Sequence, residues 1–261
     1  MKVKLDKTKL KDLVDALQNS ERAVYIKDLA GLTCEGICSI CDVVPRDKQI
    51  RVGLCNNIPK ATYDKNFGPY KYEGGFAGQT LAHYTIDELI VALDVMESIE
   101  AQIDDSWPDK EKAIFLWGYI ASNFDHKAYK GTNDYVFFEQ RQGTCTDFSK
   151  GLNNLLIRQG IESYCFACDI HAFNMVNIDG KFYPVDADVS ASNKLINGFG
   201  RKGYFSLPEL IDIYDYIQAD NEQLNSNYFE DNEIFEILDK VLPSYNKKRH
   251  SLQEKEDGKT H

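Results

Sequence analysis

The turn Asp179-Gly180 constrains the fold of this 261-residue chain more than any other short segment. Asp-Gly is a preferred pair for a two-residue type I′ turn between antiparallel strands. The flanking segments, residues 172–178 and 181–189, are rich in the β-branched and aromatic side chains that favour strands. The turn therefore predicts a hairpin in which Ile178 pairs with Lys181, and this pair sets the register of both strands.

The predicted register places a histidine and two carboxylates on one face of the hairpin. His171 opposes Asp188 and Phe173 opposes Asp186, and alternate residues of each strand share a face. A carboxylate beside an imidazole can orient the ring so that it acts as a catalytic base. The hairpin therefore predicts a base in His171 and an orienting group among the two aspartates.

A predicted helix over residues 144–159 precedes the hairpin and carries Cys145 in its first turn. Cys145 lies on the same helix face as Phe148, and this apolar face must pack against a sheet. The helix dipole and a nearby imidazolium both favour the thiolate form of a cysteine. The cysteine, the histidine and the aspartates therefore converge if this helix packs on the face that bears His171.

The residues around the cysteine read Gly143-Thr144-Cys145-Thr146-Asp147-Phe148-Ser149, and those around the hairpin read His171-Ala172-Phe173-Asn174 and Val176 to Asp186. In order, spacing and residue type these stretches resemble the transglutaminase-like superfamily of papain-like Cys-His-Asp enzymes. The resemblance covers residues 85–190. It implies an α+β fold with a papain-like, transglutaminase core, in which the nucleophile helix packs on an antiparallel sheet.

The resemblance also implies a role for each candidate catalytic residue. Cys145 is the nucleophile, His171 is the general base and acid, and Asp186 orients the histidine. The sequence departs from the family pattern at Phe173, where a tryptophan is usual, and at Asp188, where a threonine is common. Because Asp188 opposes His171 in the predicted register, it is a second candidate for the orienting role.

The oxyanion donor is not evident from the pattern of residues. Gln142, shortly before the nucleophile, is the candidate to act beside the backbone N–H of Cys145.

The activity implied by the resemblance is cysteine-dependent acyl transfer at an amide bond through a Cys145 thioester. The products are those of peptide or isopeptide hydrolysis or of deamidation, with transamidation to an amine as a further outcome. The expected substrate is a protein or peptide, and no cofactor is expected. The alternative is a catalytically degenerate member of the superfamily that binds a partner protein.

The seven cysteines form an odd number, which fits poorly with a closed set of disulfides. Cys34, Cys38, Cys41 and Cys55 have a spacing that could serve an iron–sulfur cluster or a zinc ion. However, the segment is predicted to be a strand, where Cys38 and Cys41 face opposite sides. We therefore predict no metal site and keep these four thiols as the alternative.

The charge and the apolar segments restrict the partners of the chain. Its 30 basic and 41 acidic residues give a net charge of −11, which disfavours nucleic acid and anionic membranes as partners. Apolar stretches run to only about six residues, far below the roughly 20 that span a bilayer. The first residues also lack a signal-peptide pattern. We therefore expect a cytoplasmic protein; the oligomeric state is not predicted.

The chain is expected to contain four regions. They are an N-terminal α+β region of unassigned role (1–80), the catalytic core (81–205), C-terminal helices that pack on the core (206–246) and a disordered tail (247–261).

Several elements within these regions are also predicted. Residues 37–44 and 49–54 form a hairpin. Helices begin at the capping sequence from Thr85 and near Pro108, and a last helix covers residues 232–242.

Overall fold

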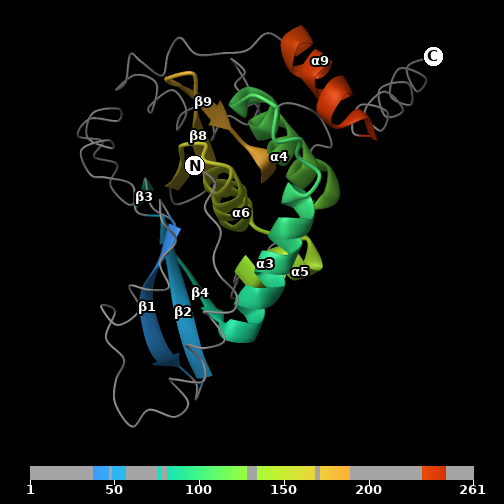
Figure 1. Ribbon diagram of the computed structural model, residues 1–261. Coiled ribbons are helices and arrows are strands. Elements are labelled where there is room, and N and C mark those ends of the chain that lie inside the picture. Colours follow the sequence, from blue (N-terminus) through green and yellow to red (C-terminus); the bar gives the residue numbers. More distant parts are fainter. Residues whose placement is uncertain are drawn as a thin grey trace, which may run out of the picture.

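The computed structural model describes residues 38–46, 49–56, 76–77, 81–127, 134–167, 171–188 and 231–244, and all structural statements refer to these residues. They form the expected mixture of helices and small sheets, of which two are antiparallel and one is a short parallel pair (Figure 1). The elements in chain order are β1 (Cys38–Arg46), β2 (Gln49–Asn56), β3 (Phe76–Ala77), β4 (Leu81–Thr85), α3 (Ile86–Glu100), α4 (Asp109–Asn123), β5 (Asp125–His126), α5 (Asp134–Gln140), β6 (Gln142–Gly143), α6 (Cys145–Arg158), β7 (Ser163–Ala167), β8 (Ala172–Ile178), β9 (Lys181–Val185) and α9 (Asp231–Val241).

A three-stranded sheet in the order β1-β2-β4 contains the predicted N-terminal hairpin. Its strands are longer than predicted and approach the turn as far as Arg46 and Gln49, which pair with each other. Cys41 lies where the register shifts, between the pairs that involve Ile40 and Asp42. The extra residue marks a β-bulge, which increases the local twist of this edge strand.

A second, four-stranded sheet in the order β3-β7-β8-β9 contains the hairpin that constrained the sequence. Asp179 and Gly180 both have positive φ angles, 53° and 79°, as a type I′ turn requires. Ile178 pairs with Lys181, so the predicted turn and register are confirmed. The ladder ends at the pair of Asn174 with Val185.

The expected pairs His171–Asp188 and Phe173–Asp186 do not form, because β9 ends at Val185. Phe173 pairs instead with Phe166 of β7. The strand predicted over residues 181–189 is therefore too long. His171, Asp186 and Asp188 lie beyond the end of the β8–β9 ladder.

Helix α6 packs on the face of β8 that bears Asn174 and Val176, not on the face assumed for convergence with His171. The side-chain amide of Asn174 donates to the carbonyl oxygen of Ser149 at 2.9 Å, and Val176 lies in one buried cluster with Phe148 and Leu152. These β8 residues alternate with Phe173, which therefore lies on the other face of the strand. All of β8 except Asn177 is buried, so the sequence shows no polar face that would have indicated which side the helix covers.

The helices on the other side of α6 complete the core. Helix α4 begins directly after Pro108, as predicted, and its apolar residues, including Trp117, are buried. Helix α9, predicted over residues 232–242, lies against α4 (Figure 1). The Nζ of Lys240 on α9 donates a hydrogen bond of 2.6 Å to Oε1 of Glu111 on α4, which links the two helices.

The two ends of α6 are fixed by different contacts. Near its C-terminus, buried Arg158 forms a bidentate ion pair with Glu100 at the end of α3, with distances of 2.6 and 3.0 Å. Near its N-terminus, four rings from α5, α6 and the end of α4 form an aromatic cluster with centroid separations of 4.7–6.4 Å: Phe124, Phe137, Phe138 and Phe148. These contacts hold the helix that carries Cys145 in one position.

Gly151 of α6 provides a test of this packing. A Cβ atom at this position would lie 2.2 Å from Cε1 of Phe137, whose ring is fully buried. Gly151→Ala gains about 1 kcal/mol of helix propensity, but the overpacking costs about 1–3 kcal/mol or more. We expect a net loss in the free energy of unfolding, measured by urea denaturation.

A matched control for this test is Ser98→Ala on the exposed surface of α3. Its expected effect lies within about 0.5 kcal/mol of wild type. A Gly151→Ala protein as stable as wild type would contradict the packing at Phe137.

Several expectations fall outside the described residues. They include residues 1–37 with Cys34, most of the proposed C-terminal helical region and the tail from residue 247. The four-region division therefore stays a prediction. In the part of the chain that the structure describes, no helix has the length and apolar character needed to cross a bilayer.

Candidate active site

The thiol of Cys145 occupies the first residue of α6, where the helix dipole favours negative charge. The start of the helix is capped by Asp147, whose carboxylate accepts hydrogen bonds from the backbone N–H and the hydroxyl of Thr144, both at 2.8 Å. Cys145 is half-buried and forms no disulfide. The predicted helix start is confirmed, and it places the sulfur at a favourable position for a thiolate.

His171 forms a short, buried contact with Asp186. Its Nε2 lies 2.5 Å from Oδ2 of Asp186, and the two side chains are 8% and 3% exposed. The carbonyl oxygen of Asp186 accepts a hydrogen bond of 3.3 Å from the indole N–H of buried Trp117. Core helix α4 thus helps to hold the segment that carries the acid, and the acid holds the ring.

The charge state of His171 follows from its neighbours. Burial of the ring opposes a positive charge, but the Asp186 carboxylate and the Cys145 sulfur outweigh it and raise the pKa of His171 to about 11. The ring is therefore an imidazolium at neutral pH. Transfer of a proton between this ring and the thiol of Cys145 leaves the total charge of the two groups unchanged.

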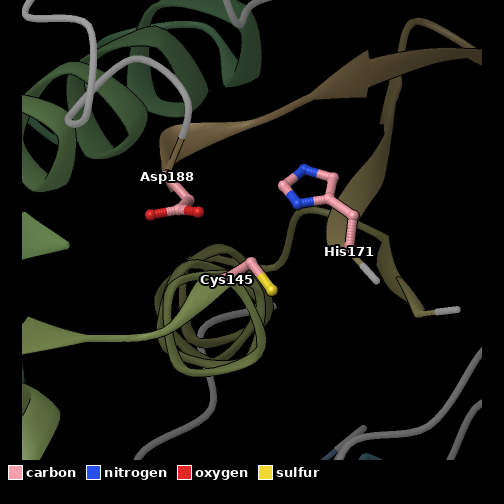
Figure 2. Close-up of side chains that lie close together, drawn as sticks. All are labelled: Cys145, His171 and Asp188. Carbon is pink, nitrogen blue, oxygen red and sulfur yellow. The ribbon is translucent and has the colours of Figure 1, made fainter. Parts of the chain in front are cut away.

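Three side chains from separate segments converge on the N-terminal end of α6. The Sγ of Cys145, a ring nitrogen of His171 and a carboxylate oxygen of Asp188 all lie within 4.8 Å of one another. In Figure 2, Cys145 at the start of α6 lies below the other two side chains, with Asp188 to one side and His171 to the other. Because Nε2 of His171 contacts Asp186, Nδ1 is the nitrogen left for the thiol.

Asp188 forms a second histidine–aspartate pair. Its Oδ1 lies 2.6 Å from Nδ1 of His126, while its backbone N–H donates to Oδ1 of Asp186 at 3.0 Å. Burial and the Asp186 carboxylate raise the pKa of Asp188, and the His126 ring acts in the opposite direction. Asp188 was expected to face His171 directly across the hairpin; it instead contacts His126, while Asp186 contacts His171.

His126 is the residue of this site that the sequence reasoning missed. It belongs to β5, which pairs with β6 immediately before the nucleophile, so that His126 lies beside Gly143. Its side chain is 41% exposed, in contrast to the 6% exposed Asp188. The available signal was a histidine directly after the segment Asn123-Phe124-Asp125, but only the parallel β5–β6 pair brings it to the site.

The remaining candidate residues have different outcomes. The side-chain amide of Gln142 donates to Oε1 of Gln140 at 2.7 Å, and its oxyanion role stays a prediction. A further cysteine, Cys165 of β7, is buried, and its thiol donates to the carbonyl oxygen of Ser149. Cys38, Cys41 and Cys55 lie on β1 and β2, and the structure does not describe their side chains.

The arrangement has the parts that cysteine-based catalysis needs. It combines a thiol at a helix N-terminus, an imidazolium beside it and a buried carboxylate that orients the ring. The structure thus contains a triad-like group of cysteine, histidine and aspartate.

Comparison with known proteins gives limited information. No family model and no curated protein matches the sequence. A solved structure from Cytophaga hutchinsonii, described as a "putative cysteine protease", is similar over 43% of this chain with 20% sequence identity and a TM-score of 0.31. The chain matches 40% of the length of that protein. A similarity this limited leaves function to be argued from the residues themselves.

Proposed function

We propose that this protein is a transglutaminase-like cysteine enzyme that transfers acyl groups from amide bonds of a protein or peptide through a Cys145 thioester. The observation that carries this proposal is the convergence of the Cys145 thiol on the His171 ring, whose other nitrogen is bound by Asp186. The papain-like core proposed for residues 81–205 rests on the sequence motifs around these residues. Their order along the chain matches that of the superfamily.

The proposed reaction begins with the thiolate–imidazolium pair. The sulfur attacks the carbonyl carbon of the amide, and a carbon–sulfur bond forms. His171 then gives its Nδ1 proton to the departing nitrogen as the carbon–nitrogen bond breaks. The amine leaves, and a thioester on Cys145 remains.

The second half of the reaction resolves the thioester. His171, now neutral, takes a proton from water or from an amine, which attacks the same carbonyl carbon. The carbon–sulfur bond breaks, and the proton returns to the pair. Water gives hydrolysis or deamidation and an amine gives transamidation; we propose hydrolysis as the main outcome.

The proposal is tested by modification of Cys145 with two small reagents. Iodoacetamide at pH 6 is expected to alkylate Cys145 at least about 10-fold faster than a free cysteine, because an imidazolium and a helix N-terminus beside a sulfur increase its nucleophilic reactivity. 4-Nitrophenyl acetate is expected to acetylate the same sulfur and release 4-nitrophenolate. Peptide mass spectrometry distinguishes Cys145 from the other six cysteines.

Cys145→Ser is the matched control, since it replaces only the sulfur. It should lose both modifications and the release of 4-nitrophenolate. A wild-type Cys145 that reacts no faster than a free cysteine at pH 6 would contradict the proposal. That result would favour the alternative of a degenerate, partner-binding module.

A further inference from the structure

We propose that Cys145, His171 and Asp188 also form a binding site for a zinc ion, and that the bound ion reversibly blocks the thiol. The three side chains place a sulfur, a nitrogen and an oxygen atom within 4.8 Å of one another. His171 and Asp188 are buried, and Cys145 is half-buried. Zinc sites with three protein ligands and one open position use these same donor types.

Each ligand has a partner that fixes its orientation. Asp186 lies 2.5 Å from Nε2 of His171, which leaves Nδ1 for the ion. Histidine ligands of zinc commonly have such a carboxylate on the other ring nitrogen. His126 lies 2.6 Å from Oδ1 of Asp188, which leaves Oδ2 for the ion. Hydrogen bonds of this kind hold ligating carboxylates in place.

The donor set and its charge favour zinc over calcium or magnesium. Thiolate and imidazole are softer donors than the all-oxygen sets of those two ions. A thiolate, a neutral imidazole and a carboxylate carry two negative charges, which balance a divalent cation at this poorly exposed site. The ion takes the place of the proton between Cys145 and His171, so a sulfur bound to it is not free to attack a carbonyl.

Binding of zinc depends only on these donor atoms. Inhibition of acyl transfer by zinc, in contrast, rests on the proposed function. Asp188 separates the two hypotheses, because it is a ligand for the ion but not the residue that orients His171. Because His126 contacts Asp188, the proposal makes His126 a positioning residue for this ligand.

The test uses the full chain, stripped of metal with EDTA and then titrated with Zn²⁺. One equivalent of Zn²⁺ is expected to stop alkylation of Cys145 by iodoacetamide, as measured on the peptide that contains it. An excess of EDTA should restore the reaction. With Co²⁺ in place of Zn²⁺, a thiolate-to-metal charge-transfer band in the ultraviolet should appear and should be absent from Cys145→Ser.

Variants then assign the ligands. Asp188→Asn is expected to raise the Kd for Zn²⁺ at least about 10-fold, and His126→Gln by about 10-fold, the range seen when supporting groups are removed. Asp104→Asn is the control, because Asp104 is an exposed carboxylate that caps a turn at Ser106. It should bind Zn²⁺ with the affinity of wild type.

The outcomes separate this inference from the proposed function. If Cys145 reacts rapidly in EDTA and equally rapidly with Zn²⁺, the zinc site is excluded and the enzyme proposal stands. If Cys145 reacts slowly in EDTA but Zn²⁺ still binds through Cys145 and Asp188, the zinc site stands and the enzyme proposal fails. A cobalt band that persists in Cys145→Ser would assign the metal to other cysteines and overturn the inference.

Discussion

His171→Gln is expected to slow alkylation of Cys145 at pH 6 by a factor on the order of 100. A free thiol has a pKa near 8.5 and is only about 0.3% thiolate at pH 6. In the wild-type protein, the imidazolium of His171 lies beside the sulfur and is retained because its pKa is raised to about 11. Glutamine fills similar space but carries no charge and cannot transfer a proton. Acyl transfer should therefore fall by about 10² to 10⁴.

The pH dependence of alkylation provides the sharper measurement. In wild type the rate should rise less steeply from pH 6 to 9 than in the variant, because His171 keeps its positive charge beside the sulfur over this range. In His171→Gln the rate should rise about tenfold per pH unit until the ordinary pKa of a thiol is reached. Both profiles are measured in EDTA, so that no metal competes for the sulfur. Parallel profiles would show that His171 does not control the thiol.

The free energy of unfolding should also depend on the charge of His171. The pKa of His171 is raised in the folded state above its ordinary value of 6.5. Its stabilising contribution is therefore full below pH 6.5 and is lost as the pH rises toward 11. We expect wild type to lose stability over this interval relative to His171→Gln, measured by urea unfolding at a series of pH values.

Asp186→Asn is expected to reduce acyl transfer by about 10² to 10⁴, the loss typical of a triad whose acid becomes an amide. The carboxylate at 2.5 Å from Nε2 both orients the ring and stabilises its positive charge. An asparagine at this position removes the charge and can leave the ring in the wrong tautomer. The initial rate of 4-nitrophenolate release from 4-nitrophenyl acetate measures the effect.

The matched comparison is Asp188→Asn, which removes the carboxylate that contacts His126 rather than His171. Its effect on acetylation should be clearly smaller, because Asp186 still holds the ring. Equal losses would mean that the two aspartates share the orienting role. A larger loss in Asp188→Asn would reverse the assignment.

The sequence predicted the local structure around the site well. Asp179-Gly180 permits the positive φ angles of a type I′ turn, so it determined the register of β8 and β9. The helix that carries Cys145 begins where the sequence predicts, and Thr144 and Asp147 cap it there. These features depend on contacts between residues close in the sequence, which is why they were predictable.

The sheet face that α6 covers could not be predicted in the same way. A strand with polar residues on one side shows which side faces solvent, but β8 is buried on both. The end of the β8–β9 ladder was also not evident, since the residues after Val185 alternate as a strand would. The consequence is that Asp186 contacts His171 in place of Asp188, while Asp188 contacts His126.

By itself, the sequence predicted the hairpin and the helix that carries Cys145, and its motifs nominated Cys145, His171 and Asp186 as candidate site residues. The tertiary structure alone decided which aspartate contacts which histidine and brought His126 to the site. The first set depends on turn and capping preferences that act over a few residues. The second depends on where strand β9 ends and on the pairing of β5 with β6. Packing between distant segments determines both the end of β9 and the pairing of β5 with β6, so no short sequence pattern predicts them.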